Sequence, residues 1–308
     1  MDPVHPAAGR NPLCALPDRA RDPGRDERVT PNEPEAYTLA APVEPSALVY
    51  DSPHSGRYFP PEIATAATPQ QLRWAEDAYV DQLLDGVVPL GVTVLAANWA
   101  RAYLDLNRAV TDIDESLLDA PWPDPVFPTD KTRRGLGLIR RFVVPGVPIY
   151  QRPLRIDDVR ERIARLHAPY HRRLAALLEE SRRAHGVAWH VNWHSMKARG
   201  NAMTPDGPNA VRPDFVVSDG HGTTAAASFT LRIVETLRAL GYQVALNDPY
   251  AGGAIVQQFG KPADGVHSVQ IEINRRLYLD EAAVTTTAGF AALRRDLQTL
   301  TTTLLASS

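Results

Sequence analysis

Several classes of protein are excluded by what the sequence lacks. The 308 residues include a single cysteine, Cys14, so no disulfide can form within the chain. No apolar run is long enough to cross a bilayer, and we expect no contact with a membrane. With 33 basic and 36 acidic residues, the net charge of -3 provides no broad basic field, so we expect no nucleic-acid partner.

The first residues differ in composition from the rest of the chain. Residues 1–35 mix proline with charge and lack the continuous apolar centre of a signal peptide. Such a segment cannot bury enough surface to offset the entropy of ordering, so we predict a disordered or loosely packed leader. We expect no chemistry from Cys14. We also expect that residues 36–308 form a single domain and that the protein is cytoplasmic.

The remaining sequence alternates strand-like and helix-like segments. Short apolar runs predict strands, and apolar residues three and four apart predict helices. The predicted strands are 47–50, 92–98, 102–108, 187–195, 214–219, 242–247 and 269–273, and the predicted helices are 69–88, 159–185, 225–240 and 290–304. This order predicts an α/β fold, a single domain with a central mixed, mainly parallel sheet flanked by helices. The proline-broken segment 121–153 predicts an ordered surface excursion that serves the site.

Polar residues fall where three predicted strands end, which is where α/β sheets collect ligands and catalytic groups. His54 follows the first strand, and His194 ends the strand 187–195. In the last strand, apolar residues alternate with Gln270, Glu272 and Asn274, so one face fits a core and the other directs polar groups outward. An edge strand with a solvated face is the alternative interpretation.

The two histidines and an acidic group predict a metal site. The acidic group is Glu76, Asp77 and Asp81, and helical spacing puts Asp77 and Asp81 on one face without choosing between them. Two imidazoles and one carboxylate around an open fourth position suit a catalytic zinc. Glu272 is then the candidate for a carboxylate that binds no metal and accepts a proton from water.

Other side chains give weaker signals. Arg101, Arg108 and Arg275 stand next to strand ends, where a guanidinium can hold a carboxylate or an oxyanion. His167 and His171 are four apart, but Pro169 lies between them and no carboxylate follows, so we predict a surface pair. The serines beside the two candidate ligands lie outside the Gly-x-Ser-x-Gly pattern of serine hydrolases.

Eight motifs in a fixed order resemble the N-formylglutamate amidohydrolase family. They lie between about residues 48 and 281 and read SPHSG, EDAYVDQL, RAYLDLNR, GLGLIRR…PIY, WHVNWHSM, DFVVSDGHGT, NDPYAGG and HSVQIEINRRLYLDE. The resemblance implies a zinc-dependent hydrolase with a fold similar to the zinc carboxypeptidases. It also implies a small carboxylate-bearing substrate, with N-formyl-L-glutamate as the first candidate, and through the family name a place in histidine catabolism.

The resemblance assigns roles residue by residue. The ligands of one divalent metal ion, Zn²⁺, would be His54, Asp77 and His194, so Asp77 is selected over Glu76 and Asp81. Glu272 would be the general base. The residues expected to shape the substrate pocket are Arg101, Asp105, Asn107, Arg108, Asn274 and Arg275. The alternatives are a metal-dependent amidohydrolase of another N-acyl amino acid or peptide-like substrate, and a non-catalytic amino-acid-binding protein; the oligomeric state is not predicted.

Two departures from the family's pattern bear on these assignments. Many relatives have an aspartate where this chain has Asn192, which puts a neutral partner near the metal site. Ala254, Gln257 and Gln258 replace an aromatic and basic residues of many relatives. If those basic residues hold a substrate carboxylate, the second departure changes what is bound.

Overall fold

The chain divides into two units, Met1–Glu33 and Pro34–Ser308. The computed structural model describes residues 33–306, all but one of which belong to the second unit. Cys14 and nearly all of the predicted leader therefore lie outside the described residues. None of the helices within residues 33–306 combines the length and apolar character that crossing a bilayer requires.

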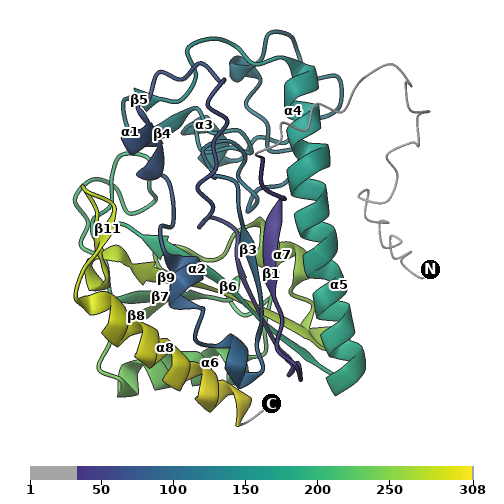
Figure 1. Cartoon of the computed structure of the whole chain (residues 1–308), viewed down its shortest axis with the longest axis vertical. Coiled ribbons are helices and arrows are strands. Elements are labelled where there is room, and N and C mark those ends of the chain that lie inside the picture. Colours follow the sequence, from purple (N-terminus) through teal and green to yellow (C-terminus); the bar gives the residue numbers. More distant parts are fainter. Residues whose placement is uncertain (1–32, 307–308) are drawn as a thin grey trace, which may run out of the picture. The chain divides into compact units, whose positions relative to one another are not determined.

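A seven-stranded sheet forms the centre of the second unit (Figure 1). Its order is β1-β3-β2-β6-β9-β7-β8, and β3, β2, β6 and β9 are parallel. β1 is antiparallel to β3, and the parallel pair β7 and β8 is antiparallel to β9. The strands are β1 (Tyr37–Ala40), β2 (Leu48–Ser52), β3 (Thr93–Ala97), β6 (Ala188–Met196), β7 (Phe215–Ser218), β8 (Val244–Leu246) and β9 (Val266–Asn274). The mixed, mainly parallel sheet is as predicted.

Helices cover both faces of the sheet (Figure 1). One face packs on α6, α8 and the short α2, and the other packs on α5 and α7. The helices are α1 (Pro69–Arg73), α2 (Val80–Leu83), α3 (Asp130–Arg133), α4 (Ile156–Arg162), α5 (Ala168–His185), α6 (Ala227–Ala239), α7 (Ala254–Phe259) and α8 (Gly289–Leu305). Two small hairpins pair β4 (Phe142–Val144) with β5 (Val147–Pro148) and β10 (Leu279–Asp280) with β11 (Thr285–Thr286).

Side-chain alternation in β6 and β9 separates an apolar face from a polar one. Val191 and Trp193 of β6 and Ile271 of β9 join the core under α6 and α8. Each fully buried side chain of this kind stabilises the fold by about 1.5–3 kcal/mol. The intervening polar side chains face α5 and α7, and the register places His194 directly opposite Glu272. Because β9 lies between β6 and β7, its polar face is not the solvated face of an edge strand.

The predicted helix 69–88 is interrupted in the structure, and Asp77 lies in the interruption. α1 ends at Arg73 and α2 begins at Val80, so Asp77 lies in the connecting segment and shares no helical face with Asp81. Three tertiary hydrogen bonds replace helical ones: Asp77 N donates to His54 O at 2.9 Å, and the Arg275 guanidinium donates to the Trp74 and Glu76 carbonyls. These bonds draw the chain out of the helix.

The predicted strand 102–108 is also wrong. The segment forms turns, in which Asp105 Oδ1 accepts a hydrogen bond from Asn107 N at 3.0 Å and Asp105 N donates to Leu138 O at 2.9 Å. A side chain that bonds the backbone two residues on is typical of a turn rather than a strand.

The histidine pair is buried rather than on the surface. The long helix begins at Ile156 and passes through a π-helical turn, Ile163–His167, just before Pro169. The rings of His167 and His171 stack with centroids 3.9 Å apart. Their Nε2 atoms bond the carbonyls of Arg108 and Leu106 at 2.9 and 2.8 Å. The pair therefore fixes the backbone of the turn that carries Asn107.

Candidate metal centre

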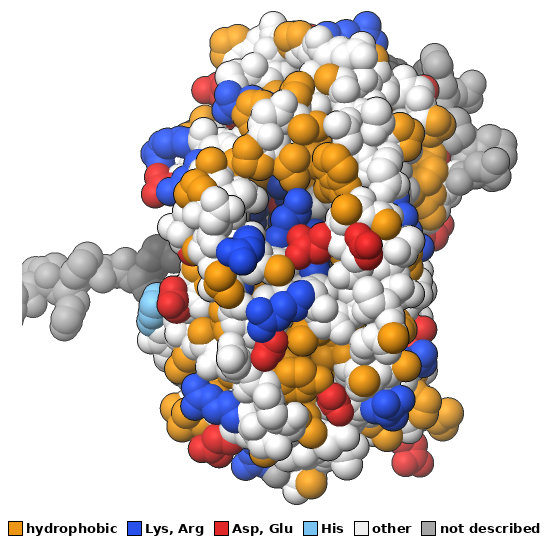
Figure 2. Space-filling view, turned by 90° about the vertical axis from the view of Figure 1, so that its left-hand side faces the viewer, with side chains coloured by type: hydrophobic (Ala, Val, Ile, Leu, Met, Phe, Trp, Pro, Cys, Tyr) orange, Lys and Arg blue, Asp and Glu red, His pale blue; other side chains and the backbone are white. Residues whose placement is uncertain are grey.

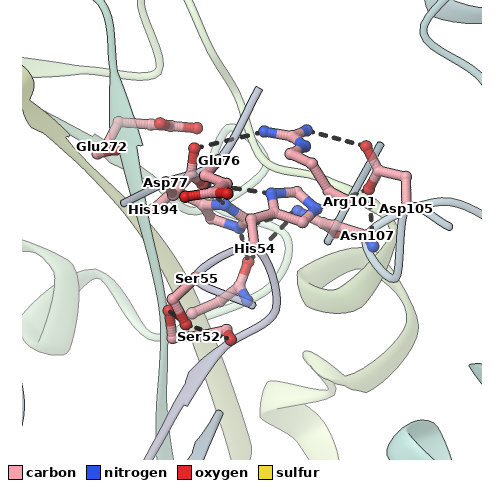
Figure 3. Close-up of polar contacts among 12 residues, drawn as sticks. Ser52, His54, Ser55, Glu76, Asp77, Arg101, Asp105, Asn107, His194 and Glu272 are labelled. Atoms are coloured by element: carbon pink, nitrogen blue, oxygen red, sulfur yellow. Dashed lines mark hydrogen bonds and ion pairs between the residues drawn. The ribbon is translucent and has the colours of Figure 1, made fainter. Parts of the chain in front are cut away.

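Three predicted ligands meet at the carboxyl end of the sheet. His54 follows β2, His194 belongs to β6, and Asp77 comes from the break between α1 and α2. One ligand atom from each lies within 4.8 Å of the other two, and each residue is at most 2% exposed. Asp77 Oδ2 is 2.9 Å from His194 Nδ1 and 3.3 Å from His54 Nδ1. Figure 3 shows both rings facing this carboxylate.

Asp105 fixes the tautomer of His54. Its Oδ1 lies 2.7 Å from His54 Nε2, and because a carboxylate only accepts, Nε2 carries the proton. The lone pair is therefore on His54 Nδ1, a buried atom that has no hydrogen-bond partner among the described residues. An orphaned, electron-rich nitrogen beside a carboxylate is suited to binding a cation.

Asn192 orients His194. Its Nδ2 donates to Asp51 Oδ1 at 2.7 Å, which turns its Oδ1 toward His194 Nε2, also at 2.7 Å. An amide oxygen only accepts, so a proton on Nε2 satisfies this contact and leaves the Nδ1 lone pair for a cation, whereas in the other tautomer Nδ1 donates to Asp77 Oδ2 at 2.9 Å. Asn107 Nδ2 lies farther from the same nitrogen, at 3.0 Å, and also reaches Gln270 Oε1 at 3.4 Å. The neutral residue that replaces an acid here still orients the ring.

Asp77 is held in its ionised form. Its Oδ1 accepts from Arg275 at 3.0 Å and from Arg101 at 3.4 Å. Burial opposes the charge, but the nearby Arg101 guanidinium holds the pKa of Asp77 well below its usual range. Two imidazole nitrogens and an ionised oxygen thus gather three electron pairs around one point. This donor set fits zinc, with three protein ligands and a position left for a water or a substrate.

Glu272 lies beside this cluster without joining it. From β9 its carboxylate extends toward Asp77 and Arg101 (Figure 3) and accepts from Gln270 Nε2 at 2.9 Å. Burial raises the pKa of Glu272, and Asp77 adds to the rise, while His194 and Arg101 oppose it. A raised pKa makes a carboxylate a stronger base, as a proton acceptor near neutral pH requires.

A cavity of about 330 Å³ opens from the cluster, a size that suits a small molecule. Eight of its lining residues are Arg or Lys and three are Asp or Glu. On the face shown in Figure 2, basic side chains gather around a hollow. The excursion predicted over residues 121–153 contributes Lys131, Arg134 and Arg140, so it does line the cavity, as expected.

The residues predicted to bind substrate fall into two groups. Arg101, Asn107, Arg108 and Arg275 line the cavity, whereas Asp105 and Asn274 are not among its lining residues. Asp105 lies behind His54 and accepts from Arg101 at 2.9 Å. The Asn274 amide donates to the carbonyls of residues 212 and 213, so it ties β9 to a neighbouring loop.

Sequence reasoning missed a buried polar network beneath His194. Asp51 accepts from Asn192, from His190 Nε2 at 3.0 Å and from the Tyr170 hydroxyl at 2.8 Å. Burial opposes ionisation of Asp51, but His190 and its other donors lower the pKa. The alternation of polar residues in 187–195 was the available signal, since it puts His190 on the face of His194.

The second departure from the family's pattern lies away from the cavity. Ala254, Gln257 and Gln258 belong to α7, and none of them is among the lining residues. Gln258 Oε1 instead contacts His171 Nδ1 at 3.2 Å. In this structure Gln258 therefore supports the histidine pair, and none of the three residues lines the cavity.

Comparison with known proteins agrees with the motif order. The sequence pattern of the N-formylglutamate amidohydrolase family matches residues 46–279. The chain is 27% identical over 241 residues to the N-formylglutamate deformylase of Pseudomonas aeruginosa, covering 77% of this chain and 83% of that protein. The corresponding enzyme of Pseudomonas putida is 28% identical over 212 residues, covering 67% and 71%.

A solved structure extends the similarity to three dimensions. N-formylglutamate amidohydrolase from Ralstonia eutropha has a TM-score of 0.80 at 42% identity, covering 86% of this chain and 95% of that one. The family's pattern covers most of the chain, and the three residues of the ligand cluster lie within the matched range. The chain therefore belongs to the N-formylglutamate amidohydrolase family.

Proposed function

We propose that this protein is a zinc-dependent amidohydrolase that cleaves N-formyl-L-glutamate to formate and L-glutamate. The observation that supports it best is the convergence of His54 Nδ1, His194 Nδ1 and Asp77 Oδ2 next to a carboxylate that binds none of them. The choice of substrate rests on the relatives, which are named for this reaction. The basic cavity fits a dianion better than a neutral or cationic amide.

The protein's own groups account for proton transfer and charge. Bound zinc would supply Lewis acidity to the formyl carbonyl and to the attacking water. Glu272 accepts a proton from that water and passes it to the leaving nitrogen, so one carboxyl group serves as base and then as acid. Gln270 keeps the Glu272 carboxylate in position through its amide hydrogen bond.

Formate release tests the reaction. Zinc-loaded protein should release formate from N-formyl-L-glutamate, lose activity with a chelator, and regain it with added zinc. A panel of N-formyl and N-acetyl amino acids is assayed in parallel. Turnover of several of these but not of the glutamate compound would reject the proposed substrate, and full activity after verified zinc removal would reject the cofactor.

The role of Glu272 has its own test. Glu272→Gln keeps the shape but removes the base, so kcat should fall by at least about 100-fold, the usual contribution of general base catalysis. Zinc content by elemental analysis should not change. Glu281→Gln is the matched control, because Glu281 accepts from Ala198 N and is not among the cavity residues. Normal turnover by Glu272→Gln would exclude it as the base.

A further inference from the structure

The basic side chains of the cavity differ in whether the protein neutralises them. Arg101 and Arg275 pair with Asp77, and Arg212 pairs with Asp206 at 2.8 Å. Within residues 33–306, no carboxylate forms an ion pair with Lys131 or Arg140. The cavity therefore holds cations whose charge the described part of the protein leaves uncompensated.

Arg140 is the more deeply buried of the two, at 7% exposure. Its guanidinium bonds only neutral carbonyls, at 3.4 Å from Nε to Phe142 O and 3.3 Å from Nη2 to Val143 O. Burial, with the nearby Arg101 and Arg108 guanidiniums, lowers the pKa of Arg140 to about 9. A buried cation without a counter-ion is unfavourable, so a ligand that brings negative charge would be strongly attracted.

Lys131 is held at the same cavity by an anchored helix. It lies on α3, and Thr129 caps that helix through Thr132 N. The buried Asp112 accepts from Thr129 N at 2.8 Å and from the Thr132 hydroxyl. The position of Lys131 is thus built into the fold and not left to a free surface loop.

We propose that Lys131 and Arg140 bind the side-chain carboxylate of the substrate and so select N-acyl amino acids with an acidic side chain. This inference rests on the proposed function. The α-carboxylate is attached to the carbon that bears the scissile nitrogen, so it must stay close to the ligand cluster, where Arg101 and Arg275 lie. The side-chain carboxylate extends farther, and the excursion supplies the unpaired cations that can meet it.

Two substrates separate this role from general binding. N-formyl-L-glutamate and N-formyl-L-glutamine share the α-carboxylate and nearly the same shape, but only the first has a charged side chain. Arg140→Met should lower kcat/KM for the glutamate compound by roughly 10- to 100-fold, as expected for losing hydrogen bonds to a charged group. For the glutamine compound the loss should be smaller, about 2- to 10-fold, because the hydrogen bond that is lost is to a neutral amide.

Thermal unfolding distinguishes recognition from a structural role. If Arg140 is an uncompensated cation, Arg140→Met should leave the unfolding temperature of the ligand-free protein unchanged or raise it. Lys131→Met provides a second variant if the first does not fold. The matched control is Arg133→Met, on the same helix but exposed, paired with Asp130 and absent from the cavity lining.

The outcomes are distinguishable. Equal losses on both substrates, or a lowered unfolding temperature with no change in selectivity, overturn the inference while leaving the proposed function intact. If the wild-type protein hydrolyses neither substrate, the proposed function fails, and calorimetric titration with glutarate decides the inference. Glutarate binding that is lost in Arg140→Met supports it, and equal binding by both proteins overturns it.

Discussion

Asp105→Asn offers a sharp test of how the proposed metal centre is organised. In the wild-type structure, Oδ1 of Asp105 accepts from His54 Nε2 at 2.7 Å, and Oδ2 accepts from Arg101 at 2.9 Å. Asparagine has one oxygen and one amino group. Whichever way it turns, a donor must face either the protonated Nε2 of His54 or the guanidinium, so one of the two contacts is lost.

The size of the effect follows from these contacts. Loss of the partner that orients a metal-binding histidine costs 10- to 100-fold in metal affinity, or about 1.4–2.7 kcal/mol. Removing one partner of a buried ion pair costs about 3–5 kcal/mol of the free energy of unfolding. Arg101 keeps Asp77 as a second partner, so we expect the lower limit, about 3 kcal/mol. For a domain of this size, the unfolding temperature should fall by roughly 6–12 °C.

Zinc titration against a competing chelator, with thermal unfolding of the zinc-free protein, measures both effects. Asp214→Asn is the control, because it also removes the charge of a carboxylate that is paired with an arginine, Arg276. Neither Asp214 nor Arg276 lines the cavity. The control should bind zinc as the wild type does. If Asp105→Asn binds zinc with unchanged affinity and also unfolds at an unchanged temperature, neither contact of Asp105 holds as argued, and the inferred tautomer of His54 is wrong.

Three further changes probe the surrounding groups. Asn192→Asp should destabilise the protein by about 1–3 kcal/mol in chemical denaturation, because it replaces the amide donor to Asp51 with a second carboxylate. Tyr170→Phe should cost about 1 kcal/mol by the same measurement, since Asp51 keeps two other donors. The pKa of Lys131 is lowered to about 8 by Arg108 and burial, so KM for N-formyl-L-glutamate should rise as the pH exceeds about 8, and Lys131→Met should lack this rise. Unfolded Lys131 keeps its proton up to about pH 10.4, whereas the folded amine loses it above about pH 8. The stability of the ligand-free wild type should therefore increase between about pH 8 and 10.4, and a flat profile would contradict the lowered pKa of Lys131.

Periodicity predicted the sheet better than it predicted the ligand positions. Alternation in β6 and β9 is a local property, and it correctly separated the apolar face from the polar face that carries His194 and Glu272. Asp77 was different, because its break from the helix depends on His54 and Arg275, which are 23 and 198 residues away in the sequence. Only the motif resemblance pointed to Asp77, since the helical spacing of the acidic group did not hold.

The same reasoning explains the misplaced strand and the buried histidine pair. The segment around Asp105 alternates like a strand, but its carbonyls are taken by His167 and His171 from a helix some sixty residues later. A histidine that bonds a distant backbone carbonyl leaves no trace in the local pattern. The residues next to His167 and His171 in the sequence are charged and apolar, and such neighbours are equally typical of a histidine on the surface.

These long-range contacts also link the proposed metal centre to the selectivity proposed for the excursion. Asp105 N donates to Leu138 O, and Leu138 N donates to Asp112 O, so backbone bonds run from the turn behind His54 to the segment that carries Arg140. Asp112 in turn anchors the helix that bears Lys131. Because the ligand cluster and the unpaired cations share this backbone, the distance between the cluster and the two cations is set by the fold. A substrate whose carboxylate is one methylene nearer, as in N-formyl-L-aspartate, must give up either its place at the metal centre or its contact with the two cations.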